Sequence, residues 1–210
     1  MCMTYSVLAR SGHCLAVATA SYSLAVGNAV PALAPGVGAV ISQAWTNRSL
    51  RHHALAGLRR GEGAEAAIAG LAASDDGWDK RQVALLPLNG SGAVHTGDAC
   101  TDYAGSIVGR DFVVAGNLLT GPAVLSAMAG QLVSIPPAGT LALAQTLVAA
   151  LQAGEAAGGD SRGKQSASLL VCANTAGDIS PPDLLIDLRV DDSPDPLTEL
   201  ARLLAAWAAG

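Results

Sequence analysis

Residues near the start of the chain have the chemistry needed for covalent catalysis. Cys2 and Thr4 both carry nucleophilic side chains, and Thr4 directly precedes an apolar, strand-like run. When such a residue is the first of a mature chain, its own α-amino group can serve as general base for its side chain. An α-amino pKa of about 7.7–8.0 leaves a useful neutral fraction at physiological pH. The pattern indicates an N-terminal nucleophile; the alternative is that a small residue merely follows an initiator methionine.

Polar residues that could assist this nucleophile lie at the ends of apolar runs. Asn47 follows one run, and Gly116 and Asn117 close another. Asp160 and Arg162 belong to a glycine-rich stretch that introduces a third run. Amide side chains and glycine N–H groups can bind an oxyanion, and Arg with Asp can bind a carboxylate-bearing substrate. Each residue, taken singly, is more often part of a capped strand end or a turn.

Other kinds of site are poorly supported. There is no phosphate-binding loop, no complete dinucleotide fingerprint and no Gly-x-Ser-x-Gly motif. The histidines lack the paired spacing of zinc ligands, and only His95, near a strand end, is a weak candidate for a catalytic base. Four acidic residues could bind Ca²⁺, but carboxylates before a helix N-terminus need no metal: Asp187, Asp191, Asp192 and Asp195. We therefore expect no metal and no organic cofactor.

Length and composition limit the class of protein. The 210 residues are expected to form one domain, residues 3–210, with a core of Ala, Leu and Val because only 3% are aromatic. A net charge of −5 argues against a nucleic-acid partner. The stretch 11–47 has no charged residue, but glycines and prolines interrupt it, so strands buried on both faces explain it better than a membrane span.

Cysteine usage and the start of the sequence bear on localisation. No Cys-x-x-Cys pair occurs, and three cysteines lie in or beside apolar runs, where small core residues are expected: Cys14, Cys100 and Cys172. The start has neither the basic nor the apolar region of a signal peptide. We expect a soluble protein in a reducing compartment, the cytoplasm.

Hydrophobic periodicity predicts the elements that position these residues. Strands are expected at 4–9, 14–20, 38–44, 82–88, 93–96, 111–115, 166–173 and 184–190. Residues 21–35 and 100–109 are expected as connections. Two helices after the third strand should bury one face each, made of Leu50, Ala54, Leu55 and Leu58 and of Ala64, Ala67, Ile68 and Leu71.

Three more helices complete the pattern. One is expected after an N-cap at Thr120, through Met128, and one at about 140–153. The last is expected after a cap at residues 192–194, with an apolar face of Leu197, Leu200, Leu203, Leu204 and Trp207. Helices in pairs after blocks of adjacent strands disfavour a parallel sheet. The expected fold is α+β: a four-layer αββα sandwich of two mainly antiparallel sheets flanked by helices.

Six stretches of the sequence carry a family resemblance: residues 38–47, 81–83, 96–100, 115–119, 153–163 and 187–196. Together they resemble the family catalogued as domain of unknown function 1028, from Met3 to near the C-terminus. This family is similar to the N-terminal-nucleophile hydrolases, whose members have the αββα fold and cleave amide bonds with the first residue of the first strand.

The resemblance assigns the nucleophile to Thr4, and the mechanism expected from it gives roles to the other candidates. Thr4 would be the nucleophile, and Asn47 or Asn117 with a glycine N–H would stabilise the oxyanion. Asp160 would orient the amine or bind substrate. The substrate-binding residues would be Ser21, Gly116 and Arg162.

The expected activity is hydrolysis of a C–N bond in a small, amide-type substrate. Superfamily members often associate, so a homo-oligomer is expected, with an apolar patch around Leu203, Leu204 and Trp207. The alternative is a catalytically inactive binding or assembly protein on the same scaffold.

Two features depart from the family pattern. Met1 and Cys2 precede the usual opening, so a start at Met1 would free Cys2 and block Thr4 unless further residues are trimmed. A start at Met3 would free Thr4. The resemblance also implies a lysine at the position of Tyr22, and a lysine there could lower a nucleophile's pKa. The absence of this lysine weakens the expected activation of Thr4.

Overall fold

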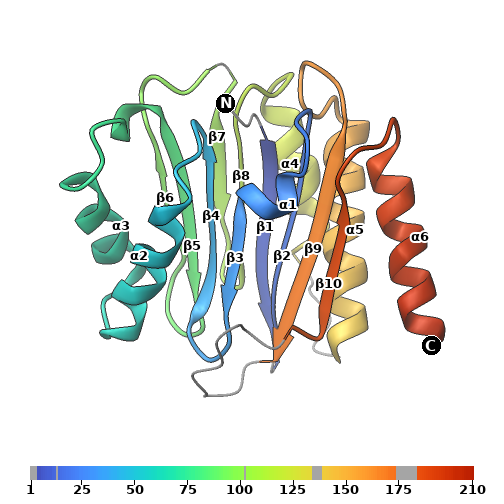
Figure 1. Cartoon of the computed structure of the whole chain (residues 1–210), viewed down its shortest axis with the longest axis horizontal. Helices are drawn as coiled ribbons and strands as arrows, with labels where there is room; N and C mark the ends of the chain where they lie inside the picture. Colours follow the sequence, from blue (N-terminus) through green and yellow to red (C-terminus); the bar gives the residue numbers. More distant parts are fainter. Residues whose placement is uncertain (1–3, 13, 102, 134–138, 174–183) are drawn as a thin grey trace.

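Two antiparallel sheets packed face to face form the centre of the fold (Figure 1). The computed structural model describes residues 4–12, 14–101, 103–133, 139–173 and 184–210. The larger sheet has the order β10 (Ile186–Val190), β9 (Ser166–Ala173), β2 (Cys14–Ser21), β1 (Thr4–Ser11), β8 (Phe112–Gly116) and β7 (Gly105–Val108). The smaller has the order β3 (Pro31–Ala34), β4 (Gly38–Ala44), β5 (Arg81–Pro87) and β6 (Ala93–Thr96).

Helices cover both outer faces of this pair of sheets (Figure 1). The larger sheet is covered by α4 (Pro122–Gly130), α5 (Gly139–Ala156) and α6 (Pro196–Ala209). The smaller is covered by α2 (Ser49–Arg59) and α3 (Ala64–Ala72). The short α1 (Val26–Ala29) and the 3₁₀ turn η1 (Trp78–Lys80) lie in connections. The predicted four-layer αββα sandwich is confirmed.

Side chains of β1 point alternately to the helical layer and to the space between the sheets. Tyr5, Val7 and Ala9 pack against the helices, whereas Leu8 belongs to the core between the sheets. Successive side chains of a strand point to opposite faces, so a strand covered on both sides must be apolar throughout. The same reason accounts for the uncharged stretch 11–47, which contains β2, β3 and β4.

Several predicted boundaries are wrong. Residues 21–35 and 100–109 were expected as connections but contain the edge strands β3 and β7, each of four residues. Gly121, not Thr120, precedes α4, and no side chain caps that helix. Likewise α6 begins at Pro196, after Asp195, rather than directly after residues 192–194.

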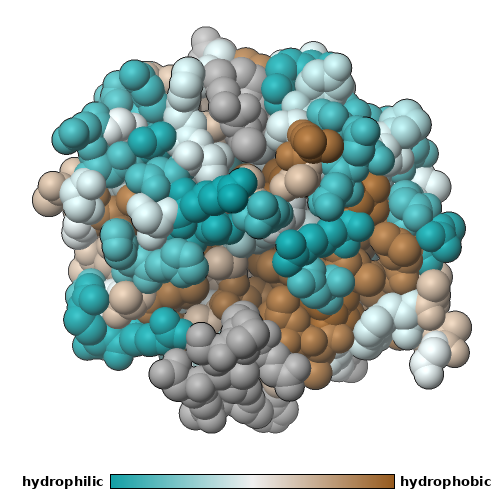
Figure 2. All heavy atoms as spheres, in the orientation of Figure 1, coloured by the Kyte–Doolittle hydropathy of each residue, from teal (hydrophilic) through white to brown (hydrophobic). Residues whose placement is uncertain are grey.

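Surface features bear on the expected partners. Figure 2 shows an apolar area over β9 and β10 on this face of the molecule. Of the patch expected on α6, Leu204 is buried in the core, Leu203 is half-buried and Trp207 is exposed. Self-association through this helix stays a prediction. Across the described ranges, no helix is both long enough and apolar enough to cross a membrane.

Candidate active site

Four strand ends meet at one edge of the larger sheet, the upper edge in Figure 1. Thr4, the first residue of β1, pairs with Ser21, the last of β2. Tyr5 pairs with Gly116 at the end of β8, and Ser21 pairs with Ser166 at the start of β9. The hairpin β1–β2 and its two neighbouring strands therefore collect four of the predicted site residues at this edge: Thr4, Ser21, Gly116 and Asn117.

The Thr4 side chain points between the two sheets. It shares a face of β1 with Ser6 and Leu8, and Leu8 lies in the inter-sheet core. The Thr4 hydroxyl has no exposed surface and donates a hydrogen bond of 3.3 Å to Oγ of Ser21. Oγ of Ser21 lies 2.9 Å from Oγ of Ser23, which is half-buried. A row of three hydroxyl groups thus leads from Thr4 toward the surface.

Two glycines in the loop between α5 and β9 bring Asp160 to this edge. Gly158 has φ of +119°, and a Cβ there would lie 2.1 Å from Oγ1 of Thr120. Gly159 has φ of +55°. Residues with side chains disfavour these left-handed conformations, so the turn depends on glycine. The chain that leaves this turn forms a β-bridge between Asp160 and Leu119, just after β8.

The Asp160 carboxylate is fully buried and organises the loop that follows β2. It accepts the N–H of Tyr22 at 3.0 Å and the N–H of Arg162 at 3.0 Å. The Arg162 guanidinium donates to it at 2.7 Å and lies 5.4 Å from the centre of the Tyr22 ring. Asp160 is therefore joined to the Thr4 site through the segment 21–23, next to the serine that Thr4 contacts.

Asn117 is tied to the backbone of Thr4. Its N–H donates to the Thr4 carbonyl at 3.0 Å, and its Nδ2 donates to Oε1 of Gln82 at 3.2 Å. The side chain is buried. Gly116 directly precedes it, and the Gly116 carbonyl accepts from Gln82 at 2.9 Å. The backbone N–H of Asn117 is already bonded to the Thr4 carbonyl. The predicted role of Asn117 at an oxyanion would therefore have to come from its side chain.

Asn47 lies apart from this cluster by its contacts. Its Oδ1 accepts the N–H of Ser49 at 3.1 Å and the hydroxyl of Ser49 at 2.8 Å, at the start of α2. Its side chain also contributes, as the weakest of several causes, to the lowered pKa of Asp75. None of the contacts described for Asn47 involves Thr4, so its predicted oxyanion role stays a prediction that these contacts do not favour.

Sequence reasoning missed two glutamines beside Thr4. Gln43 of β4 and Gln82 of β5 are fully buried and hydrogen-bonded to each other at 2.7 Å. Nε2 of Gln43 also lies 3.4 Å from the Thr4 carbonyl. A glutamine inside an apolar strand is the available signal, since a buried amide must find partners.

Tyr5 lies beneath the site, on the helix-facing side of β1. Burial raises the pKa of its phenol above the ordinary value, and the negative charges of Glu155 and Asp160 raise it further. A phenol that keeps its proton cannot act as a base at neutral pH. Tyr5 is therefore a packing residue under Thr4 rather than a proton acceptor.

A second buried ion pair secures the loops at the same end of the smaller sheet. Nε of Arg81 donates to Asp75 at 2.7 Å and a second guanidinium nitrogen donates at 2.9 Å, while a third bonds the Trp45 carbonyl. The Asp75 side chain is 6% exposed. The hydrogen bond from Arg81 is the main reason that the pKa of Asp75 lies below its ordinary value.

We expect this pair to give an acid-sensitive part of the stability. A carboxyl whose pKa is lowered by folding stabilises the fold above its unfolded pKa of about 3.9, and this contribution is lost as pH falls through the folded pKa. Asp75→Asn should lower the unfolding free energy at pH 7 by about 1.5–3 kcal/mol. It should also flatten the loss of stability below about pH 4.

Urea unfolding from pH 7 down to pH 2.5 measures this effect. Asp76→Asn removes the exposed carboxylate of the next residue and is the matched control. If the unfolding free energy falls equally steeply at low pH in Asp75→Asn and in the unaltered protein, the Asp75–Arg81 pair is not the source of the acid sensitivity.

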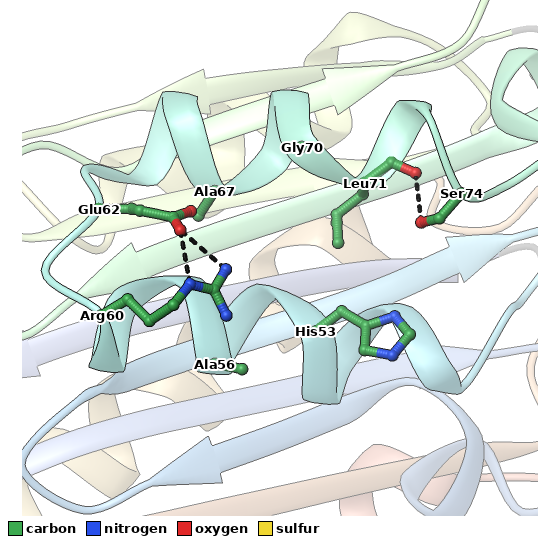
Figure 3. Close-up of a pocket in the computed structure, with 8 residues that line it drawn as sticks. All are labelled: His53, Ala56, Arg60, Glu62, Ala67, Gly70, Leu71 and Ser74. Carbon is green, nitrogen blue, oxygen red and sulfur yellow. Dashed lines mark hydrogen bonds and ion pairs between the residues drawn. The ribbon is translucent and has the colours of Figure 1, made fainter.

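Two grooves lie in or beside the helical layer rather than near Thr4. One, of about 380 Å³, runs between α2 and α3. Figure 3 shows its Arg60–Glu62 ion pair and the hydroxyl of Ser74 bonded to the Leu71 carbonyl. The other, of about 410 Å³, includes His95, whose ring stacks on Trp78 at 4.0 Å and whose Nε2 lies 2.9 Å from the Trp78 carbonyl. These contacts give His95 a structural role.

Metal ligands do not gather anywhere in the part of the chain that the structure describes. No group of three His, Cys, Asp or Glu residues there could hold an ion. Of the cysteines, Cys14 and Cys172 are buried as predicted and Cys100 is half-buried. Burial raises the pKa of Cys172 to about 12, which makes its thiol inert. Met1 and Cys2 lie outside the described residues.

Comparison with known proteins gives a family and a fold. A family model described as "Family of unknown function (DUF1028)" matches residues 4–200. The crystal structure of protein SPO2555 from Silicibacter pomeroyi, also assigned to DUF1028, is 31% identical with a TM-score of 0.85, over 99% of this chain and 90% of that chain. None of the curated proteins is similar enough to this chain to count as a match.

More remote structures are two Anbu proteins. A mutant of Anbu from Hyphomicrobium sp. strain MC1 is 13% identical with a TM-score of 0.49, over 98% of this chain and 95% of that chain. Anbu, named an ancestral beta-subunit, from Yersinia bercovieri is 11% identical with a TM-score of 0.42, over 98% of this chain and 94% of that chain. Both are too distant to bear on function. By the match over residues 4–200 and the likeness to the Silicibacter protein, the chain belongs to the DUF1028 family of unknown function.

Proposed function

We propose that this protein is an N-terminal-nucleophile hydrolase that cleaves a C–N amide bond of a small substrate, with Thr4 as the nucleophile. The observation that carries the proposal is the position of Thr4. It begins the central strand β1, faces the space between the sheets and contacts the Ser21 hydroxyl at 3.3 Å. A hydroxyl held next to its own backbone nitrogen can use that nitrogen as a base once it is a free amine.

The reaction divides into two steps. The amine of Thr4 takes the proton from Oγ1, and the oxygen attacks the amide carbon to form a tetrahedral intermediate. The protonated amine then gives its proton to the leaving nitrogen, the C–N bond breaks and an ester to Thr4 remains. Water attacks this ester, with the amine as base, and releases the acid. Asp160 holds the loop beside Thr4, and Arg162, whose side chain is 29% exposed, would bind the substrate.

A condition follows from the mechanism: Thr4 must be the first residue of the active form. With the preceding residues attached, the nitrogen of Thr4 is an amide and cannot act as a base. In the structure of the full sequence, the Thr4 side chain is 0% exposed.

This burial favours a second candidate, a catalytically silent binding protein on the same scaffold. A fully buried hydroxyl offers no access to a substrate, so a chain in which Thr4 stays buried would bind ligands at most. The two candidates differ in whether Thr4 can be acylated.

Acylation of Thr4 tests the proposal directly. The protein whose first residue is Thr4 should form a covalent ester with an activated acyl amide, such as an acyl p-nitroanilide panel, and hydroxylamine should remove it. Intact-mass measurement should detect the adduct, and peptide mapping should place it on Thr4. The form that retains residues 1–3 is the control and should stay unmodified. Equal labelling of both forms, or labelling away from Thr4, would contradict an N-terminal nucleophile.

A further inference from the structure

Two glutamines form a polar bridge through an otherwise apolar inter-sheet core. Gln43 and Gln82 are register partners on β4 and β5, both 0% exposed. Their neighbours in this layer are apolar side chains such as Ile41, Ala84 and Leu86. A primary amide in such surroundings costs free energy unless its donors and acceptor are satisfied.

The amide of Gln43 bonds Gln82 in its own sheet at 2.7 Å and reaches three groups of the opposite sheet. Its Oε1 accepts the Ser6 hydroxyl at 2.7 Å, and Ser6 in turn lies 2.8 Å from the Thr19 hydroxyl. Its Nε2 lies 3.4 Å from the Thr4 carbonyl and 3.3 Å from the Ala115 carbonyl. Gln43 therefore links β4 directly to β1 and β8, and through Ser6 to Thr19 of β2.

The amide of Gln82 continues the bridge at the end of β8. Its Nε2 lies 2.9 Å from the Gly116 carbonyl, 3.1 Å from the Gly105 carbonyl and 3.0 Å from the Thr96 hydroxyl. Its Oε1 accepts from Gln43 and Asn117.

One peptide group is consequently held from both sides. The carbonyl of the Gly116–Asn117 peptide accepts from Gln82, and its N–H donates to the Thr4 carbonyl. Apolar side chains resist separation of two sheets but, lacking direction, resist sliding much less. Hydrogen bonds have preferred distances and angles and so fix relative position.

We propose that Gln43 and Gln82 are positioning residues, which set the location of Thr4 and of the Gly116–Asn117 peptide relative to the smaller sheet. The effect on turnover rests on the proposed function of Thr4. The effect on the structure does not, since it concerns only the hydrogen bonds between the sheets.

The test compares Gln43→Met with Leu170→Ala. Methionine keeps the length of glutamine but removes the hydrogen bonds to Ser6, Gln82 and the Thr4 carbonyl. Leu170 lies in the same inter-sheet core, outside the bridge, so Leu170→Ala loosens this core without cutting the bridge. Amide exchange followed by NMR reports the Asn117 N–H individually, and kinetics of the form that begins at Thr4 report kcat and KM.

For Gln43→Met, the Asn117 N–H should exchange at least about tenfold faster, relative to core amides, than in Leu170→Ala. The kcat should fall about 10–100-fold while KM changes by less than about threefold, because misplaced reacting groups slow chemistry more than binding. Gln82→Met should behave alike. The double variant should be less damaging than the sum of the two, since the bond between them is lost only once.

If the Asn117 N–H exchanges no faster, relative to core amides, in Gln43→Met than in Leu170→Ala, the two glutamines do not couple the sheets. This holds whatever the kinetics show. Faster exchange with unchanged kcat would overturn the positioning role. If no form of the protein turns over an amide, the proposed function fails, whereas the exchange data still decide whether the bridge couples the sheets.

Discussion

Replacing Thr4 by alanine should reduce turnover by at least about 10³-fold in the form of the protein that begins at residue 4. The substitution removes Oγ1, the atom that would attack the substrate, and leaves the amine in place. Removing a nucleophile leaves only the rate enhancement that binding and oxyanion stabilisation supply. The loss should appear in kcat, because few substrate contacts depend on this one hydroxyl.

The fold should tolerate this change. Alanine loses the 3.3 Å hydrogen bond to Ser21, and one neutral hydrogen bond contributes about 0.5–1.5 kcal/mol. Urea unfolding of Thr4→Ala should therefore shift only modestly, which separates loss of chemistry from loss of structure.

Two further variants define the role of the hydroxyl. Thr4→Ser keeps an oxygen nucleophile and should retain activity within about 100-fold, limited by the freer rotation of serine about χ1. Ser21→Ala removes the partner of Oγ1 and should reduce kcat by about 10-fold or more if Ser21 orients the hydroxyl. Turnover in Thr4→Ala equal to that of the unaltered form would rule out Thr4 as nucleophile.

The fold could be predicted from the sequence because each layer of the sandwich requires a local pattern of apolar residues in its strands or helices. The buried face of α3 consists of the residues expected from helical spacing: Ala64, Ala67, Ile68 and Leu71. Strands β6 and β9 have the expected bounds, and Gly90, in the connection between β5 and β6, has φ of +90°. Strand runs and a positive-φ turn residue are local properties, so a single sequence carries them.

Edge strands escaped prediction because they carry weak patterns. Strand β3 has only four residues and starts at Pro31, and proline usually argues against a central strand. Strand β7 alternates half-buried and exposed residues from Gly105 to Val108, too short a stretch to show periodicity. Their pairing with β4 and β8 supplies the stability that their own sequences lack.

In the candidate site, too, contacts set by local strand pairing could be predicted, whereas contacts set by packing between the sheets could not. The Thr4–Ser21 contact follows from a tight hairpin, because the register of β1 and β2 places the two residues opposite each other. The bridge of Gln43 and Gln82 depends on the packing of one sheet on the other, which no local pattern specifies. Asn47 was expected near Thr4 as a strand-end residue, and the hydrogen bonds described for its side chain are with Ser49.

Asp160→Ala should destabilise the protein by about 3–5 kcal/mol, much more than most surface substitutions. The Asp160 side chain is 0% exposed, and the Arg162 side chain is 29% exposed. Loss of the carboxylate leaves the guanidinium partly buried without this counter-ion, and breaking such a pair from one side costs several kcal/mol. It also strips the N–H of Tyr22 of its acceptor.

Asp187→Ala is a matched control within the same chain. Asp187 and Arg189 have the same spacing, i and i+2, and a similar contact of 2.8 Å, but their side chains are 38% and 40% exposed. Exposed pairs contribute about 0–1 kcal/mol because water screens the charges. Unfolding in urea should therefore separate the two alanine variants by at least about 2 kcal/mol, and burial alone accounts for the difference.

Asp160→Asn distinguishes structure from charge at this position. The amide can still accept the N–H of Tyr22, so the loop 21–23 should keep its place, while the charge that balances Arg162 is lost. If Asp160 acts by holding that loop, Asp160→Asn should recover a good part of the Thr4 acylation rate lost in Asp160→Ala. If its charge orients the Thr4 amine, the two variants should acylate equally slowly. Equal stability of Asp160→Ala and Asp187→Ala would contradict both of these roles. It would mean that the buried carboxylate does not organise this edge of the sheet.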